Sequence, residues 1–347
     1  MAELLGGKYE VLELAGEGGM AKVYRGRTHG AAGFSRPVAI KRVLAPLSQN
    51  PDFLKMFVEE ARVVSELDHP NIAQIHDFDR DRAGEYYLVL EWVDGLTLFD
   101  WAKAHTDRGL DAPWALVAAV GIEVLKALHA AHQHTDPLGA PTPIVHRDVT
   151  PQNVMLSACG VVKLTDFGLA RAMDRSSITK PGFVKGKIAY LAPELTYEAR
   201  PNAQTDVFST AVVLWEALAG EKMFKGKDPV KVIRTIQGMN IPSLAGTRPD
   251  IPPRLCAIVD RALERDPRAR YPTAREMGRD LAGLLREFTT ETDEHALSQS
   301  VAWAREQLGE EPVTRSFPAQ HALALATSAD ETIPDASIPL TRRIKRT

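Results

Sequence analysis

The stretch that decides the fold is His146-Arg147-Asp148-Val149-Thr150-Pro151-Gln152-Asn153, followed at a short distance by Asp166-Phe167-Gly168. Asp148 stands in a loop, Asn153 follows five residues later, and Asp166 comes after a pair of predicted strands. Together they offer three oxygen donors around a hard cation and a nucleophile. Each residue alone is more often part of an Asx-turn. The whole set, in this order and downstream of a lysine on a strand, is highly specific and is not a chance assembly.

A glycine-rich segment lies upstream, at Gly16-Glu17-Gly18-Gly19-Met20-Ala21-Lys22-Val23, between two predicted strands. Glycines let backbone amides approach a triphosphate without a Cβ in the way. Ala21 replaces the third glycine of the usual GxGxxG pattern, and a hairpin turn without a ligand is the simpler explanation of this segment alone. A dinucleotide-binding fold is excluded because a strand, and not a helix, follows the glycines.

Lys41 ends the apolar strand Val38-Ala39-Ile40-Lys41. It is either a charge partner for phosphates, fixed by a carboxylate, or a surface lysine whose stem covers apolar neighbours. Glu60 lies within a predicted helix and is the expected carboxylate. Its neighbour Glu59 is the alternative, since adjacent helical positions point about 100° apart and only one can face inward. Ala61, directly after Glu60, favours Glu60.

Two sequence patterns, one typical of strands and one typical of helices, divide most of the chain into two parts. Residues 9–93 carry short β-branched runs with glycine connectors and one helical pattern over Asn50–Leu67, which predicts a small β-rich lobe. From Leu96 onward helical spacing dominates, interrupted by a loop-rich block at Ile144–Glu194. The helices predicted there are Leu96–His105, Ala112–His134, Thr205–Leu218, Pro229–Gln237, Pro253–Glu264 and Thr273–Phe288. The predicted fold class is α+β with two lobes, about 9–93 and about 94–286.

Residues 287–347 form a C-terminal extension. Leu297, Val301, Ala304 and Leu308 recur at helical spacing, which predicts one more amphipathic helix. Residues 310–347 are rich in Pro, Thr, Ser and Ala without periodicity, which predicts a largely disordered tail.

Composition limits the class of partner. The 347 residues carry a formal net charge of −3, which does not favour nucleic acid or an anionic membrane as the main partner. The sequence has two cysteines, Cys159 and Cys256, which are far apart and lack CxxC spacing. This pattern fits a protein of a reducing compartment. No signal-peptide pattern begins the sequence, and charged or polar residues interrupt the apolar stretches Ala112–Leu128 and Val207–Ala219 before they reach the length of a membrane span. We expect a cytoplasmic protein without a membrane span.

By these motifs, residues 9–286 resemble a bacterial member of the eukaryotic-type Ser/Thr protein kinases. The resemblance implies ATP as phosphate donor, Mg²⁺ (or Mn²⁺) as cofactor and an active-state ion pair between Lys41 and Glu60. It also implies a gatekeeper at Leu90 and a hinge at Glu91-Trp92-Val93 that hydrogen-bonds adenine through its backbone. The nucleotide-binding residues that it implies are Ala15, Gly16, Glu17, Gly18, Gly19, Met20, Ala21, Lys22, Val23, Ala39, Lys41, Leu90, Glu91 and Val93.

The resemblance also assigns roles around the phosphate acceptor. Asp148 would accept the proton of the substrate hydroxyl, while Asn153 and Asp166 would bind the metal. Ala192-Pro193-Glu194 resembles the end of an activation segment, with Glu194 paired to Arg270. Asp206 would brace the backbone of the catalytic loop. These last features have no counterpart in small-molecule kinases and favour a protein substrate with Ser or Thr acceptors.

Two positions depart from the family pattern. Thr150 stands where Ser/Thr kinases carry a lysine that neutralises the γ-phosphate, and Lys187 stands where they carry a threonine that contacts that lysine and the catalytic aspartate. Our hypothesis is that the pair has exchanged places, so that Lys187 supplies the missing charge near Asp148. The alternative is a solvated Lys187 and a weakened or inactive enzyme. Thr150 also matches neither the pattern of Ser/Thr kinases nor that of Tyr kinases, so this position does not indicate the acceptor.

Arg147 before the catalytic aspartate is typical of kinases controlled by phosphorylation of the activation loop. Ser176, Ser177 and Thr179 are candidate sites there, although a polar, mobile loop explains them equally well. Autophosphorylation in trans, through a transient dimer, would follow. The basic run at 342–346 is more often a solvated chain end than a docking motif. A pseudokinase is the competing function, supported only by Thr150 and Ala21.

Overall fold

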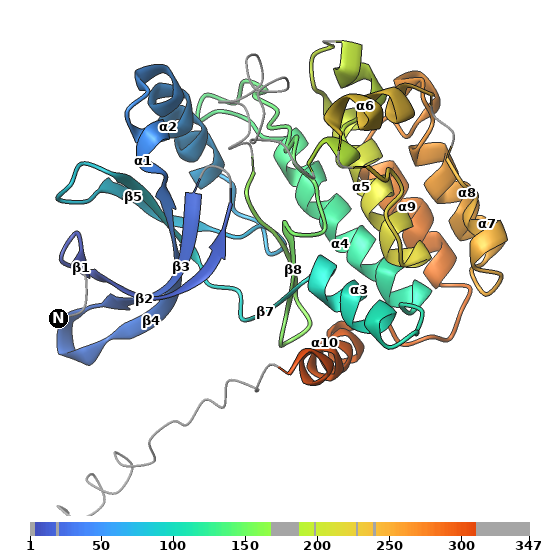
Figure 1. Ribbon diagram of the computed structural model, residues 1–347, viewed down its shortest axis with the longest axis horizontal. Helices are drawn as coiled ribbons and strands as arrows, with labels where there is room; N and C mark the ends of the chain where they lie inside the picture. Colours follow the sequence, from blue (N-terminus) through green and yellow to red (C-terminus); the bar gives the residue numbers. More distant parts are fainter. Residues whose placement is uncertain are drawn as a thin grey trace, which may run out of the picture. The chain divides into compact units, whose positions relative to one another are not determined.

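The computed structural model describes residues 4–18, 21–167, 187–197, 199–226, 228–238 and 241–309, except the side chains of residues 45, 46, 52, 60 and 187. These residues belong to one compact unit that runs to Glu310. Within it a β-rich N-terminal lobe is followed along the chain by a helical C-terminal lobe (Figure 1).

The N-terminal lobe is built on a six-stranded antiparallel sheet in the order β1-β2-β3-β4-β6-β5. Its strands are β1 (Leu4–Leu5), β2 (Tyr9–Glu17), β3 (Ala21–His29), β4 (Ser35–Val43), β5 (Ile75–Arg80) and β6 (Tyr86–Glu91). Period-two alternation gives the central strand β4 two different faces. Val38 and Ile40 are fully buried on one face, so that Ala39 and Lys41 point to the other.

Two helices follow β4, α1 (Ala45–Ser48) and α2 (Pro51–Ser65). Asn50 caps α2, since its side-chain oxygen accepts from the backbone N–H of Phe53 at 3.1 Å. Phe53 and Phe57 on α2 join Leu88 of β6 in one apolar cluster, which holds the helix against the sheet. β1 and α1 are not predicted from the sequence, because elements of two and four residues are too short to show periodicity.

The C-terminal lobe is helical. Its helices are α3 (Leu98–Asp107), α4 (Trp114–His132), α5 (Ala203–Ala219), α6 (Pro229–Gly238), α7 (Leu244–Thr247), α8 (Pro253–Ala262), α9 (Ala274–Leu285) and α10 (Glu294–Leu308). In the described part of the chain only α4 has the length and apolarity of a membrane span. It packs against α5 and α9 and most of it is buried, so it is the core helix of this lobe (Figure 1).

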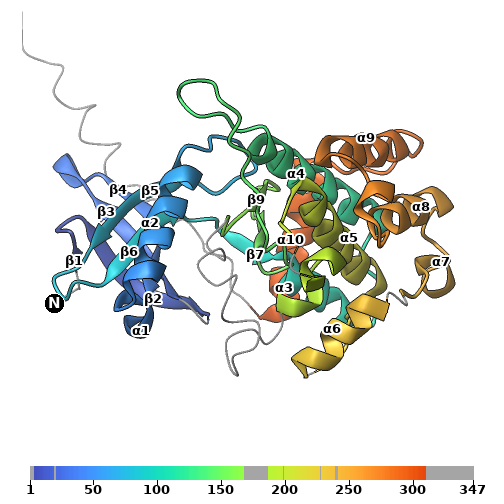
Figure 2. The same ribbon diagram turned by 90° about the horizontal axis from the view of Figure 1, so that it is seen from above.

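A small antiparallel sheet in the order β7-β8-β9 lies beside these helices (Figure 2). Its strands are β7 (Gly95–Thr97), β8 (Val154–Ser157) and β9 (Val162–Leu164). The catalytic-loop motif ends directly before β8, and Asp166 follows β9 by two residues. Because β8 and β9 pair with Val154 opposite Leu164, the two ends of the deciding stretch are brought together.

Candidate active site

Lys41 and Asp166 meet although 125 positions separate them in sequence. The Lys41 ammonium Nζ lies 2.6 Å from Oδ1 of Asp166. The Lys41 side chain is only 12% exposed, so it is not a surface lysine whose head group lies in water. The side chain of its expected partner Glu60 lies outside the described part of the structure, and that ion pair stays a prediction.

The glycine-rich segment is a hairpin between β2 and β3. Gly16 pairs with Val23 and Glu17 with Lys22, and the amide of Gly18 donates to the carbonyl of Ala21 at 2.9 Å. Gly19 and Met20 at its tip lie outside the described residues. The strand–turn–strand geometry agrees with the sequence analysis, which excluded a dinucleotide-binding loop for this reason.

The backbone of the catalytic loop is bound by Asp206, a fully buried carboxylate on α5. Its two oxygens accept the backbone N–H groups of His146 and Arg147, both at 2.8 Å, and Nε2 of His132 donates to it at 2.8 Å. Arg147 has φ = 67°, a conformation unfavourable for a non-glycine residue, and the bond from its amide to Asp206 helps to stabilise it. The predicted bracing role of Asp206 is confirmed.

His146 links this loop to the segment that carries Asp166. Its Nε2 donates to the carbonyl of Thr165 at 3.0 Å, while its Nδ1 accepts from the amide of Asp148 at 3.2 Å. Its ring centroid lies 4.4 Å from that of Phe167. Complete burial lowers the pKa of His146, which keeps the imidazole neutral and in the tautomer that these two bonds require.

Asp148 and Asn153 are joined directly. The Asn153 amide nitrogen donates to the backbone oxygen of Asp148 at 2.7 Å and to its carboxylate Oδ2 at 2.9 Å. The backbone oxygen of Asn153 accepts from the amide of Thr165 at 2.8 Å, one residue before Asp166. Asp148, Asn153 and Asp166 are therefore fixed relative to one another through short backbone links.

The donor set suits a hard divalent cation. Because the amide nitrogen of Asn153 is committed to Asp148, its oxygen is the atom it can offer a metal, and Asp166 offers a carboxylate. Among the described residues no cluster of three or more His, Cys, Asp or Glu side chains could hold a metal ion.

Thr150 is buried in the catalytic loop, where its carbonyl oxygen accepts from the amide of Asn153 at 3.0 Å. Lys187 begins the short 3₁₀ helix η3 (Lys187–Tyr190). Its side chain lies outside the described part of the structure, so the exchange of Thr150 and Lys187 stays a hypothesis. Ser176, Ser177 and Thr179 lie outside the described residues as well.

The hinge begins where β6 ends. Leu90 pairs with Ala39 across β4 and β6, so these two nucleotide-binding candidates stand opposite each other. The amide of Glu91 donates to the carbonyl of Gln74 at 2.9 Å, and its carboxylate binds Lys163 at 2.9 Å. Val93 follows two residues later and is partly buried.

The end of the activation segment is anchored by a buried ion pair. Arg270, with no exposed side-chain surface, binds Glu194 through two bonds of 2.7 and 2.9 Å. The prediction of this pair is confirmed. In the preceding turn, η3, the Tyr190 hydroxyl donates to Glu216 at 2.7 Å, and Lys222 binds the same carboxylate at 2.9 Å.

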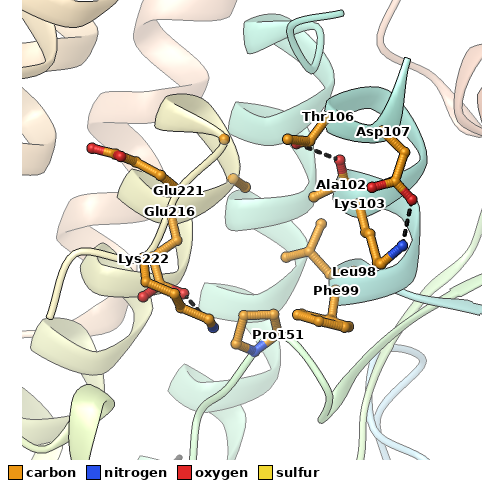
Figure 3. A pocket seen from close by; sticks show the side chains of 12 residues that line it. Leu98, Phe99, Ala102, Lys103, Thr106, Asp107, Pro151, Glu216, Glu221 and Lys222 are labelled. Carbon is orange, nitrogen blue, oxygen red and sulfur yellow. Dashed lines mark hydrogen bonds and ion pairs between the residues drawn. The ribbon is translucent and has the colours of Figure 1, made fainter. Parts of the chain in front are cut away.

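A pocket of about 200 Å³ lies beside the catalytic loop, between α3 and the end of α5 (Figure 3). Pro151, three residues after Asp148, lines it together with the apolar side chains of Leu98 and Phe99. Lys222 and Glu216 stand on the opposite wall (Figure 3). This pocket is not predicted from the sequence, because no motif marks Phe99 or Lys222.

Comparison with known proteins gives one consistent result. Residues 9–280 match the family model described as a protein kinase domain. Tyrosine-protein kinase MasK from Myxococcus xanthus is 35% identical over 308 residues, covering 89% of this chain and 47% of that protein. Serine/threonine-protein kinase PrkC from Bacillus subtilis is 32% identical over 301 residues, covering 84% and 43%. The crystal structure of the PknI kinase domain from Mycobacterium tuberculosis aligns with a TM-score of 0.61 and 26% identity, covering 81% of this chain and 98% of that one. The chain spans less than half the length of these two curated relatives.

Proposed function

The chain belongs to the protein kinase family and has its two-lobed α+β fold, and from this premise we propose that it transfers the γ-phosphate of ATP to serine or threonine hydroxyls of proteins. The observation that carries the proposal is the contact of Lys41 with Asp166, made beside the linked pair Asp148 and Asn153. The ammonium group of Lys41 from the N-terminal lobe and three oxygen-bearing side chains from the C-terminal lobe thus lie around one site. Phosphoryl transfer needs this arrangement, because its catalysis is mainly positioning and charge neutralisation.

Each of these residues has a distinct task in the proposed reaction. Lys41 binds the phosphates of ATP, and the backbone of the glycine-rich hairpin covers them. Asp148 accepts the hydrogen bond of the acceptor hydroxyl and takes its proton as the new P–O bond forms. The bond from Asn153 fixes the Asp148 carboxylate in one orientation, and Asp206 fixes the loop that carries both.

Mg²⁺ is the proposed ion, with Mn²⁺ as the alternative, and Asn153 and Asp166 are the residues that would hold it. When bound, the ion neutralises phosphate charge during transfer. The remaining nucleotide contacts that we propose are the backbone of Glu91-Trp92-Val93 for adenine, with Ala39 and Leu90 beside it. The facing register of Ala39 and Leu90 supports this assignment.

We propose that the acceptor segment of a protein substrate passes over the pocket next to Pro151. Its wall of Leu98 and Phe99 suits an apolar side chain near the acceptor. Glu216 would attract a basic side chain, but Lys222 and Tyr190 already engage it. A substrate arginine would have to displace Lys222, so the pocket favours apolar over basic residues there.

The chemical class of the acceptor needs its own test. The names of the relatives differ in the acceptor, since MasK is called a tyrosine-protein kinase and PrkC a serine/threonine-protein kinase. Thr150 fits neither acceptor pattern. We propose Ser/Thr specificity, because the rest of the segment matches the Ser/Thr pattern. Phospho-amino-acid analysis of the products, with phosphotyrosine as the contrary result, decides between them.

The proposal is tested by autophosphorylation with labelled ATP and Mg²⁺, comparing the wild type with Asp148→Asn. Loss of the aligning carboxylate should lower the rate by about 10² to 10⁴. Phosphate is expected between residues 169 and 187, added in trans within a transient dimer. We also propose a signalling role in the cytoplasm, on the sequence features given above. Equal labelling of both proteins would refute the catalytic assignment, and a wild type that binds ATP without transferring phosphate would identify a pseudokinase.

A further inference from the structure

Helix α10 lies beyond residue 280, where the family match ends, yet it is built into the C-terminal lobe. Val301 and Ala304 on α10 are fully buried in the main apolar core. The Trp101 indole N–H on α3 donates to the hydroxyl of Ser300 at 3.0 Å. The ring of His105 stands between Trp101 and Trp303, with centroids 4.6 and 4.5 Å away. The helix is therefore fixed on α3, as both ribbon views agree (Figures 1 and 2).

The beginning of α10 is fixed on the turn between β8 and β9. The Ser298 hydroxyl donates to the carbonyl of Ala158 at 2.7 Å. Gly160 has φ = 84°, and a Cβ there would lie 1.8 Å from the backbone oxygen of Glu294. No other residue fits this approach without moving the helix, so the turn and α10 are matched to each other.

The end of α10 reaches the residue that follows the hinge. The Arg305 guanidinium lies 2.6 Å from Oδ1 of Asp94, and its side chain is only 13% exposed. The backbone oxygen of Asp94 accepts from the amide of Ala158 at 2.7 Å, on the same turn that Ser298 contacts. Asp94 is thus held twice. Arg305 of α10 binds its side chain, and the β8–β9 turn, which α10 contacts, binds its backbone.

The other end of the hinge is held independently. Glu91 is fixed by the carbonyl of Gln74 and by Lys163. The three residues proposed to bind adenine, 91–93, therefore run between two anchored points, and only the second anchor depends on α10. Because a small displacement of backbone donors weakens a directional contact strongly, an anchor at Asp94 acts on the adenine site without touching the nucleotide.

We propose that α10 is a functional part of the nucleotide site and that Arg305 is its positioning residue, holding the hinge through Asp94 in the geometry that binds adenine. The inference rests on the proposed use of ATP. A lost anchor lowers the affinity for ATP but leaves the phosphate-transfer residues in place. The expected signature is a raised KM for ATP with little change in kcat.

The experiment uses the full chain and compares wild type, Arg305→Gln, Asp94→Asn and the reversed pair Asp94→Arg with Arg305→Asp. Each single variant should raise KM for ATP and the Kd of ATP with Mg²⁺ by about 2- to 30-fold, the range given for residues that modulate a site without touching its ligand. The reversed pair should recover at least part of the loss, because it restores opposite charges at the same two positions.

Ser300→Ala is the matched control, since it removes an α10 contact that is made to Trp101 of α3 and to neither Asp94 nor the β8–β9 turn that holds its backbone. It should lower the thermal midpoint without changing KM for ATP. An unchanged KM in Arg305→Gln, or an equal rise in Ser300→Ala, would overturn the inference while the wild type remains an active kinase. A wild type that binds no ATP would instead overturn the proposed function.

Discussion

Replacement of Arg270 by methionine should be among the most damaging changes in the C-terminal lobe. Besides its two bonds to Glu194, the guanidinium donates to the carbonyls of Glu264 at 2.6 Å, Gln204 at 3.2 Å and Arg265 at 3.2 Å. Its central carbon also lies 4.7 Å from the ring centroid of Phe208. Methionine keeps the aliphatic part of the side chain and its contact with Phe208 but removes every hydrogen-bond donor. The nearly buried carboxylate of Glu194 then has no cationic partner at this position.

Removing one partner of a buried ion pair costs about 3–5 kcal/mol of unfolding free energy. At about 2–4 °C per kcal/mol, the thermal midpoint should fall by about 6–20 °C. Arg268→Gln is the matched control, because this arginine lies two positions away and its side chain is 89% exposed in its pair with Asp266. Its midpoint should not change measurably, since solvent screens such a pair. Thermal and urea unfolding of both variants give the comparison.

The double variant Arg270→Met with Glu194→Leu separates the ion pair from the other bonds of Arg270. If the uncompensated Glu194 charge causes much of the loss, the double variant should be less unstable than the sum of the single variants by about 0.5–3 kcal/mol. Strict additivity would refute the account of a buried pair. A midpoint for Arg270→Met equal to that of Arg268→Gln would refute the role of burial altogether.

Two further predictions concern the catalytic charge and pH. Lys187→Thr should lower the kinase rate strongly, and adding Thr150→Lys should recover part of it; a harmless Lys187→Thr, or a double variant no better than it, would contradict the exchange. Stability should fall as pH drops below about 6.5, because burial lowers the pKa of His105 and His146 in the fold, so that the unfolded chain takes up protons first. Urea midpoints between pH 7.5 and 5 measure this, and a flat profile would contradict it.

Much of the fold could be predicted because its signals are local. Helices such as α5 and α9 show their period and their caps within one stretch of sequence, and the structure has them within a few residues of the predicted bounds. The catalytic motif fixed the positions of Asp148, Asn153 and Asp166, and the confirmed partners of Asp206 and Arg270 followed from the family resemblance.

What could not be predicted depends on contacts between distant segments whose residues carry no motif. The bond between Asp94 and Arg305 joins positions 211 apart, and neither residue is unusual in its own surroundings. The same holds for Lys222, which reaches Glu216 from the loop after α5 and changes what the neighbouring pocket can bind. Amphipathic spacing predicted α10 as a helix but not the surface against which it packs.

Three contacts between distant segments, one of them unpredicted, share one physical feature, which is that each holds a loop from outside the loop. Asp206 holds the catalytic loop, Arg270 the end of the activation segment, and Arg305 the residue after the hinge, in each case through a charged group that is mostly or fully buried. A charge in such a place is costly unless its partner is held in the right geometry, so each pair is stable in one arrangement of its loop and unstable in others. The catalytic residues themselves can then remain few and polar, since the surrounding pairs, and not their own packing, determine where they lie.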